Sequence, residues 1–378
     1  MTPADLAVEF PQPEDLIYLN HAGVSPWPRC AALAVQRFAE ENIVSGPLHY
    51  ERWLETETRL RDQLRSLINA ASTDEIALLK NTSEGLSFVA GGLSWARGDN
   101  IVTCAEEFPS NRIPWQALAE RGVILREVAL PPDSDLESAL GAACDRHTRL
   151  LTISSVQFAS GFRVDLDALG VFCRARGILF CIDAIQGLGA LPLDVATCHA
   201  DFVVADAHKW LLGPEGIALF YVAERVWDRL RPSEYGWHMT ARPGNYDSKT
   251  WRVADTAKRF ECGSPNLLGT HAFSASLSLI QELGIAAISR AVINNTSYLL
   301  DQLTNNLGAT VLSPGAERRL SGIVSFRPRD GEVATLHRRL RQHGVVCAVR
   351  GGAIRWSPHF YTPRRKLDRA LALLAAPR

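Results

Sequence analysis

Polar and charged residues stand at the ends of three apolar segments of this 378-residue chain. Asp183 closes the segment ILFCID, Lys209 follows FVVADAH, and Thr82 and Ser83 follow EIALLKN. Continuous apolar segments of this length are typical of buried strands. Because ligands of α/β proteins collect at the carboxyl ends of strands, we expect these four side chains to lie close together.

Each of the four residues suits one part of a single ligand. Thr82 and Ser83 open a predicted helix, whose free N–H groups and positive dipole end suit a phosphate. A buried carboxylate such as Asp183 favours a positive charge on a neighbouring ring nitrogen. A lysine in a partly apolar site can lose its proton and act as a nucleophile. The set fits pyridoxal 5′-phosphate (PLP), held by Lys209 as a Schiff base, with the ring serving as an electron sink.

The bulk composition is that of an ordinary globular protein, with 47% hydrophobic and 21% charged residues. The length allows two domains with sizeable cores. A formal net charge of −1 argues against nucleic acid or a membrane surface as partner. The sequence shows neither a basic, apolar leader nor a run long enough to span a bilayer, so we expect a cytoplasmic protein. The eight cysteines are scattered without a CxxC pair, so we expect no disulfide framework and no metal.

The first two thirds of the chain alternate between predicted strands and helices. A long helical stretch is expected over about residues 31–71, before this alternation begins. Predicted strands cover residues 75–80, 100–105, 149–156, 178–184, 201–206 and 216–222, and predicted helices cover 84–93, 113–122 and 164–177. This alternation indicates a mostly parallel sheet with helices on both faces. The last two strands are joined too closely for a crossover helix and are expected to be antiparallel.

The pattern changes near residue 269. Two long helical segments, residues 271–284 and 286–306, lead into short strands at 322–326, 344–349 and 353–358 and a final helix. We therefore predict an N-terminal arm and active-site loop (1–30), a large PLP-binding domain (31–265) and a small C-terminal α/β domain (266–378).

The pair of motifs DAIQG and HKWLLGPEG resembles the class V aminotransferase family, which includes cysteine desulfurases, kynureninase and isopenicillin-N-epimerase-like proteins. The resemblance runs from YLNHAG to RWSPHFYT, over nearly the whole chain. It implies the PLP-dependent transferase fold type I, with a seven-stranded sheet in the large domain. It also implies a homodimer with active sites at the subunit interface. By this resemblance Lys209 is the Schiff-base lysine and Asp183 pairs with the pyridine nitrogen.

The resemblance assigns further cofactor contacts. Gln186 is expected to bond the phenolic oxygen, and His208 to bind the phosphate with Thr82 and Ser83. Phe108, in EEFPSN, stands where the family places a side chain over the pyridine ring. Ser264, in GSPN, is expected to reach the phosphate of the neighbouring subunit's cofactor.

Substrate contacts are expected from two further segments. AIRWSPHFYT resembles the family's carboxylate-binding strand, so Arg355 is the predicted clamp for the substrate α-carboxylate; a planar guanidinium matches a carboxylate in two bonds. Asn20 and His21, in YLNHAG, are candidate substrate-binding residues. The roles of Trp237 and His238 stay open.

Three departures from the family pattern bear on the reaction. Cys347 lies inside the apolar segment GVVCAV, where a thiol is expected to be packed rather than mobile. A desulfurase that forms a persulfide on a mobile cysteine is therefore disfavoured. Asp206 stands where many relatives have a phosphate-binding serine, and Gln157 and Phe158 stand where many have an asparagine facing the phenolic oxygen. The roles of Asp206 and Gln157 stay open.

These observations favour an aminotransferase acting through Lys209. The alternatives are a lyase that eliminates sulfur from a cysteine derivative and an amino-acid epimerase, because all three reactions begin with removal of the α-proton. A nucleotide-binding protein is disfavoured because QGLGAL is not GxGxxG. A non-catalytic regulator with the PLP fold is disfavoured because Lys209, Asp183 and Gln186 are all present.

Overall fold

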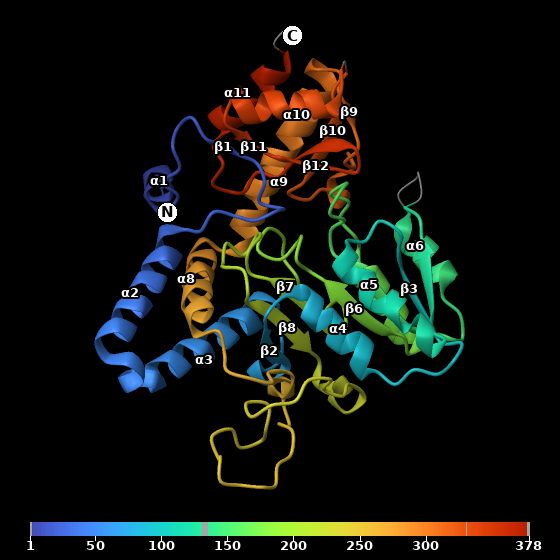
Figure 1. The fold of residues 1–378 in the computed structure, drawn as a ribbon. Coiled ribbons are helices and arrows are strands. Elements are labelled where there is room, and N and C mark those ends of the chain that lie inside the picture. The colour runs from blue at the N-terminus through green and yellow to red at the C-terminus, as the bar shows by residue number, and fades with distance from the viewer. Residues whose placement is uncertain (1, 131–134, 330, 376–378) are drawn as a thin grey trace.

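The computed structural model describes residues 2–130, 135–329 and 331–375. A large central sheet with flanking helices lies below a smaller sheet that carries the C-terminal helices (Figure 1). The N-terminal arm runs between the two (Figure 1). Its helix α1 (Pro3–Glu9) begins at Thr2, whose side chain accepts a hydrogen bond from the Asp5 N–H.

The large sheet has seven strands in the order β2-β8-β7-β6-β5-β3-β4. Strands β3 to β7 form parallel pairs, whereas β8 is antiparallel to both β7 and β2. The predicted mostly parallel, seven-stranded sheet and the antiparallel last pair are thus confirmed. The strands are β2 (Ile76–Leu79), β3 (Asn100–Cys104), β4 (Ile124–Val128), β5 (Thr148–Ser154), β6 (Leu179–Asp183), β7 (Phe202–Asp206) and β8 (Ala218–Val222).

Helices cover both faces of this sheet. They are α3 (Tyr50–Leu67), α4 (Thr82–Gly92), α5 (Ile113–Gln116), α6 (Leu136–Ala143), α7 (Leu166–Arg176) and α8 (Leu267–Leu283), and α2 (Arg29–Ser45) packs against α8. The single helical stretch expected over residues 31–71 is wrong. Gly46, at φ +53°, ends α2, and a short 3₁₀ turn over Gly46–His49 separates it from α3. A positive φ is easily adopted by glycine, and proline at position 47 cannot continue the helical hydrogen bonding.

Two more predictions for this part of the chain were incomplete. The helix expected over residues 113–122 is α-helical only over Ile113–Gln116 and continues as a 3₁₀ helix over Ala117–Arg121. Edge strand β4 was not predicted, because its residues are partly exposed and lack a continuous apolar run.

The smaller sheet has the strand order β12-β13-β10-β9. Its strands are β9 (Thr310–Val311), β10 (Val324–Arg327), β12 (Ala348–Arg350) and β13 (Ala353–Trp356). It packs with helices α9 (Ile285–Asp301), α10 (Val333–Gln342) and α11 (Arg364–Ala375). The N-terminal arm packs into the same hydrophobic core, and its strand β1 (Ile17–Tyr18) forms a separate two-stranded parallel sheet with β11 (Val345–Val346).

Two separate hydrophobic cores underlie the two sheets. Phe273, Leu277 and Ile280 of α8 belong to the core of the large sheet, as does Ile288 near the start of α9. Leu299, farther along α9, belongs to the core of the small sheet. The boundary predicted at residues 265/266 stays a prediction.

Among the described residues, no single helix is long and apolar enough to cross a membrane. The pair Leu267–Leu283 and Ile285–Asn306, bent by 83°, meets the criterion together on length and composition alone.

Candidate active site

Asp183 and Lys209 lie at the carboxyl ends of neighbouring strands. Asp183 ends the fully buried strand β6 and accepts a hydrogen bond from the N–H of Ile185 at 3.0 Å. The pKa of Asp183 is raised to about 7. Burial is the main cause, the charge of Glu107 adds to it, and the charge of Lys209 opposes it. A carboxylate that is costly to bury as an anion is stabilised by a cation placed beside it.

Lys209 follows β7 and is 9% exposed. Burial lowers the pKa of its ammonium group to about 8, against the opposing attraction of Asp183. Its Nζ lies 5.6 Å from the ring centroid of Phe108. Near neutral pH roughly a tenth of this amine is therefore uncharged, and this fraction can act as nucleophile or base.

A row of contacts runs from Lys209 to Arg355. The ring of Phe108 lies edge-on to the ring of Phe158, with centroids 5.2 Å apart. Arg355 donates from Nη1 to the carbonyl oxygen of Phe158 at 2.7 Å. Phe108 and Phe158 thus form the apolar wall between the lysine and the guanidinium.

Arg355 is held in the middle of β13, between Ser325 of β10 and Ala348 of β12. The residue is 1% exposed, and burial, together with the charge of Arg350, lowers its pKa to about 9. Its buried Nε has no hydrogen-bond partner among the described residues. A desolvated guanidinium with free donors is suited to a ligand carboxylate.

The phosphate-binding turn predicted at Thr82 and Ser83 is the first turn of α4. Asn81 caps this helix by accepting from the N–H of Glu84 at 2.9 Å. The N–H of Thr82 donates to Oδ2 of Asp206, and Oγ1 of Thr82 accepts from the N–H of Asp206, both at 3.1 Å. Asp206 therefore ties the end of β7 to the start of α4. The hydroxyl of Ser83 donates to Ser110, so phosphate binding by Thr82 and Ser83 stays a prediction.

His208 and Gln186 lie beside this turn and the lysine. Nδ1 of His208 is buried, lies 3.9 Å from Oδ1 of Asp206 and has no hydrogen-bond partner among the described residues. Burial, followed by the charge of Lys209, lowers the pKa of His208 to about 4. Gln186 donates to the carbonyl of Ala22 at 3.1 Å and accepts from the indole N–H of Trp210. The second amide N–H of Gln186 is left for a ligand.

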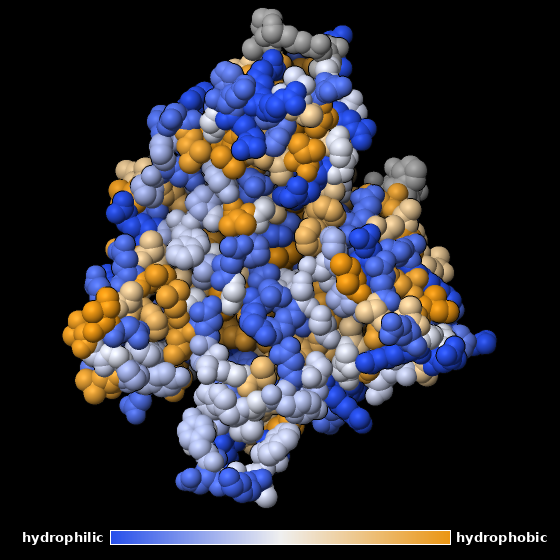
Figure 2. Space-filling view, viewed as in Figure 1, coloured by the Kyte–Doolittle hydropathy of each residue, from blue (hydrophilic) through white to orange (hydrophobic). Residues whose placement is uncertain are grey.

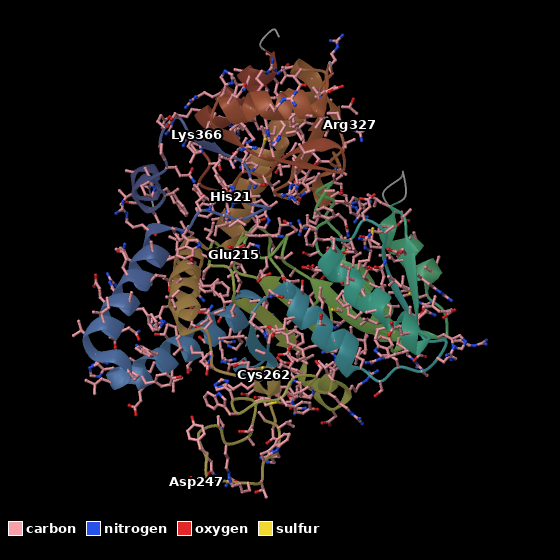
Figure 3. The ribbon with its side chains drawn as sticks, in the orientation of Figure 1. His21, Glu215, Asp247, Cys262, Arg327 and Lys366 are labelled. Carbon is pink, nitrogen blue, oxygen red and sulfur yellow. The ribbon has the colours of Figure 1, made fainter. Side chains whose placement is uncertain are left out.

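Both ring nitrogens of His21 contact groups of the protein, and its predicted role in substrate binding stays a prediction. His21 lies where the N-terminal arm passes between the two sheets (Figure 3) and is fully buried. Its Nδ1 is 2.8 Å from the carbonyl of Ser357 and its Nε2 is 2.7 Å from the hydroxyl of Tyr361. With both ring nitrogens engaged, His21 links the arm to the small domain. Asn20 keeps a buried Oδ1 without a partner, so its predicted contact with substrate stays open.

Ser264 and Trp237 lie on the segment that joins β8 to α8. This segment projects from the bottom of the molecule, with Asp247 at the tip and Cys262 near its return to the body (Figure 3). Ser264 is exposed, and Trp237 is 40% exposed. His238 lies 3.8 Å from Glu261 through Nδ1.

Glu107 was not among the site residues predicted from the sequence. It is fully buried and binds four groups on the segment and strand around Phe108. The only signal in the sequence was a second acidic residue, in EEFPSN, directly before the predicted stacking residue.

The residues present fit PLP. Several other buried polar atoms lack hydrogen-bond partners among the described residues and can bind a polar ligand. They are Asn20 Oδ1, Gln157 Oε1, His208 Nδ1 and Arg355 Nε. Such atoms are costly unless a ligand or water satisfies them. An amine, a carboxylate for a ring nitrogen and a helix N-terminus for a phosphate are the parts that this cofactor needs.

The sequence model of the family described as Aminotransferase class-V matches residues 17–360. This chain belongs to the class V aminotransferase family. PLP is the cofactor of this family and of this chain, and the fold is PLP-dependent fold type I.

Similar proteins are named for cysteine chemistry. A probable cysteine desulfurase of Methanothermobacter thermautotrophicus is 30% identical over 396 residues, covering 97% of this chain and 96% of the relative. Another, of Pyrococcus abyssi, is 27% identical and covers 98% and 96%. Among solved structures, the cystine C-S lyase C-DES in complex with its product cysteine persulfide has a TM-score of 0.90 at 24% identity, covering 97% and 99%. The apo cysteine desulfurase of Thermococcus onnurineus NA1 has a TM-score of 0.87 at 24% identity, covering 98% and 97%.

The prediction of an aminotransferase is wrong. The relatives with which this chain shares most of its length are named cysteine desulfurases, which the sequence reading had disfavoured. Of the reactions considered, the alternative that breaks the carbon–sulfur bond of a cysteine derivative agrees better with these names.

Proposed function

We propose that this chain is a PLP-dependent C–S lyase, which breaks the bond between the β-carbon and sulfur of a cysteine-type amino acid such as L-cystine. The observation that carries the proposal is the row of contacts Lys209–Phe108–Phe158–Arg355, whose two cationic ends are buried. It places a base and a carboxylate clamp at the two ends of one apolar wall. The names of the relatives supply the sulfur chemistry.

Arg355 would bind the substrate α-carboxylate with Nε and Nη2, because Nη1 is already bonded to the carbonyl of Phe158. PLP, when bound, withdraws electrons from the α-carbon of the substrate. The uncharged Nζ of Lys209 would take the proton from that carbon. Asp183 would hold the ring nitrogen in its protonated form, which strengthens the withdrawal of electrons.

The bond that then breaks is Cβ–S, and sulfur leaves with the electron pair of that bond. The ammonium of Lys209 formed in this way can return its proton to the leaving sulfur. With L-cystine and water the products are pyruvate, ammonia and cysteine persulfide. No oxidant or reductant is needed.

The names of the relatives favour a second candidate, desulfuration of cysteine to alanine with transfer of sulfur to a thiol. In this chain Cys347 is 8% exposed beside β11, and burial raises its pKa to about 11. Cys262 is partly exposed on the projecting segment. These two thiols are the residues to replace when the two candidates are compared.

Product analysis tests the proposal. The holoenzyme is incubated separately with L-cystine and L-cysteine, and pyruvate, ammonia and alanine are measured. We expect pyruvate and ammonia in equal amounts from L-cystine, retained in a protein with both Cys262→Ser and Cys347→Ser and lost in Lys209→Ala. Alanine without pyruvate, abolished by the cysteine replacements, would support the second candidate instead.

We also propose that two copies form a homodimer through the segment between β8 and α8. Its aromatic side chains are unusually exposed, Tyr235 by 64%, Tyr246 by 73% and Trp251 by 63%. Apolar residues also gather at the corner where α2 meets α3 (Figure 2), with Ile43 85% and Val44 83% exposed. Patches of this kind mark protein–protein contacts more often than free surface.

Light scattering after size exclusion measures the mass of the protein in solution. We expect twice the mass of one chain, and a shift toward a single chain when Trp251→Ser and Ile43→Ser are combined. Ser264→Ala, at the predicted contact with the partner's cofactor, should weaken PLP binding in the dimer. A wild-type protein of single-chain mass would overturn this proposal.

A further inference from the structure

The buried Glu107 organises the loop that carries Phe108. Its carboxylate accepts hydrogen bonds from the N–H of Ser154 at 2.7 Å and from the Ser154 hydroxyl. It also accepts from the side-chain amides of Gln157 at 2.8 Å and Asn111 at 3.0 Å. Four donors on one carboxylate stabilise the anion, in opposition to the burial that raises the pKa of Glu107.

This carboxylate is connected to Asp183 through Ser154, on the neighbouring strand. Ser154, which donates twice to Glu107, is the last residue of β5 and is paired in register with Asp183 at the end of β6. Neighbouring strands of a sheet are about 4.8 Å apart. The charge of Glu107 accordingly acts on Asp183 and raises its pKa.

Lys209 supplies positive charge near the two carboxylates. Its charge lowers the pKa of Asp183, and Glu107 forms no ion pair among the described residues. Once Lys209 is joined to PLP, its charge is no longer that of a free ammonium. Two interacting buried anions need a nearby cation to offset their desolvation.

We infer that Glu107 is a positioning residue that, through Asp183, keeps the pyridine nitrogen of PLP protonated. Its charge raises the proton affinity of the Asp183–ring nitrogen pair, and its hydrogen bonds fix the loop that carries Phe108. The amide of Gln157 is held by the same carboxylate, so that Oε1 is left as its free, buried acceptor. The inference rests on Asp183 facing the ring nitrogen and does not depend on which substrate bond is broken.

The direct test is nitrogen NMR of the holoenzyme reconstituted with PLP labelled with ¹⁵N in the ring. The chemical shift of this nitrogen reports whether it carries a proton. It is followed across the pH range in which the protein stays folded, in wild type, Glu107→Gln, Glu106→Gln and Asp183→Asn. Glu106 is the matched control, because it is the preceding glutamate, is exposed and makes no side-chain hydrogen bond among the described residues.

The other titratable groups around Glu107 and Asp183 are the same in Glu107→Gln and in Glu106→Gln. They are Asp206 at the end of β7, Lys209 after it, and the thiols of Cys104 on β3 and Cys181 on β6. Glutamine at position 107 can keep most of the network, because the amide of Gln157 and the hydroxyl of Ser154 can each turn to offer an oxygen, whereas Asn111 is held by Trp115 and Thr152.

We expect the ring nitrogen of Glu107→Gln to lose its proton at a pH at least one unit lower than in wild type and in Glu106→Gln, a tenfold change in proton affinity. Asp183→Asn should show an unprotonated ring nitrogen at neutral pH. Identical ¹⁵N titrations of Glu107→Gln and wild type would overturn the inference, whereas a protonated nitrogen in Asp183→Asn would overturn the assignment on which it rests. If Glu107→Gln does not fold, Glu107→Met, uncharged and of similar length, is measured in its place with the same criteria.

Discussion

At the scale of single residues, burial adjusts the site before any ligand binds. Lys209 has its pKa lowered to about 8 and Arg355 to about 9, in each case mainly because burial disfavours the charged form. Because the charged forms are costly to bury, binding of the cofactor by Lys209 and of the substrate carboxylate by Arg355 is favoured.

The lowered pKa of Lys209 predicts how the apo-protein takes up PLP. Only the uncharged amine can attack the aldehyde, and the amine is mostly protonated below a pH of about 8. The rate of covalent attachment, followed by absorbance, should rise about tenfold between pH 7 and pH 9, where the uncharged fraction rises from roughly a tenth to nine tenths. A rate that is flat over this range would contradict the lowered pKa.

Replacement of Arg355 predicts a defect in substrate binding. Loss of a hydrogen bond to a charged group costs about 1.5–3 kcal/mol, and 1.4 kcal/mol corresponds to a tenfold change. Arg355→Ala should therefore raise KM for the amino acid by roughly 10–100-fold and change the Kd for PLP far less. Arg350→Ala, on the neighbouring strand β12 and exposed, serves as the matched control. An equal loss of PLP binding and substrate binding would show that Arg355 is structural.

The residues of the site were predictable from the sequence to unequal degrees. Asp183 and Lys209 were recognisable because each directly follows a continuous apolar strand in a known motif. The contacts of His21 were not predictable, because its partners, Ser357 and Tyr361, come more than 300 residues later. Glu107 was missed because nothing in EEFPSN shows which of the two glutamates points inward.

At the scale of elements, the N-terminal arm contributes to the small domain. Strand β1 pairs with β11, and His21 bonds groups beyond the end of β13. The sequence showed neither contact, since two-residue strands carry no periodic pattern. The break between α2 and α3 was overlooked for a different reason: the apolar spacing continues past Gly46 although the backbone turns there.

His21→Phe is predicted to destabilise the fold rather than to impair substrate binding. It keeps the ring volume but removes the ring's hydrogen bonds to the carbonyl of Ser357, which retains the backbone N–H of residue 21 as donor, and to the hydroxyl of Tyr361. A buried polar group left unsatisfied costs about 1–3 kcal/mol. The free energy of unfolding should fall by about that amount or more, with KM changed less than about threefold. Tyr361→Phe, which removes one of the two bonds, should show a smaller loss. A large rise in KM with unchanged stability would support the substrate role predicted for His21.

At the scale of the whole molecule, the sheet was the most predictable feature. Six of its strands are short apolar runs, and such runs are buried on both faces only when helices cover the sheet. The reaction was not predictable in the same way. Transamination, epimerisation and elimination share their first proton transfer, and the sequence shows no difference in how the next bond is aligned. The names of the relatives, and not a pattern in the residues, indicate a reaction at a carbon–sulfur bond.

The central claim is that Lys209 is the residue that holds PLP. The holoenzyme is reduced with borohydride, digested and analysed by mass spectrometry to find the lysine that carries the cofactor. The account predicts that the label lies on Lys209, in near-stoichiometric yield, and that Lys209→Ala binds PLP without a reducible covalent bond. A label on another lysine, or an undiminished yield in Lys209→Ala, would contradict it.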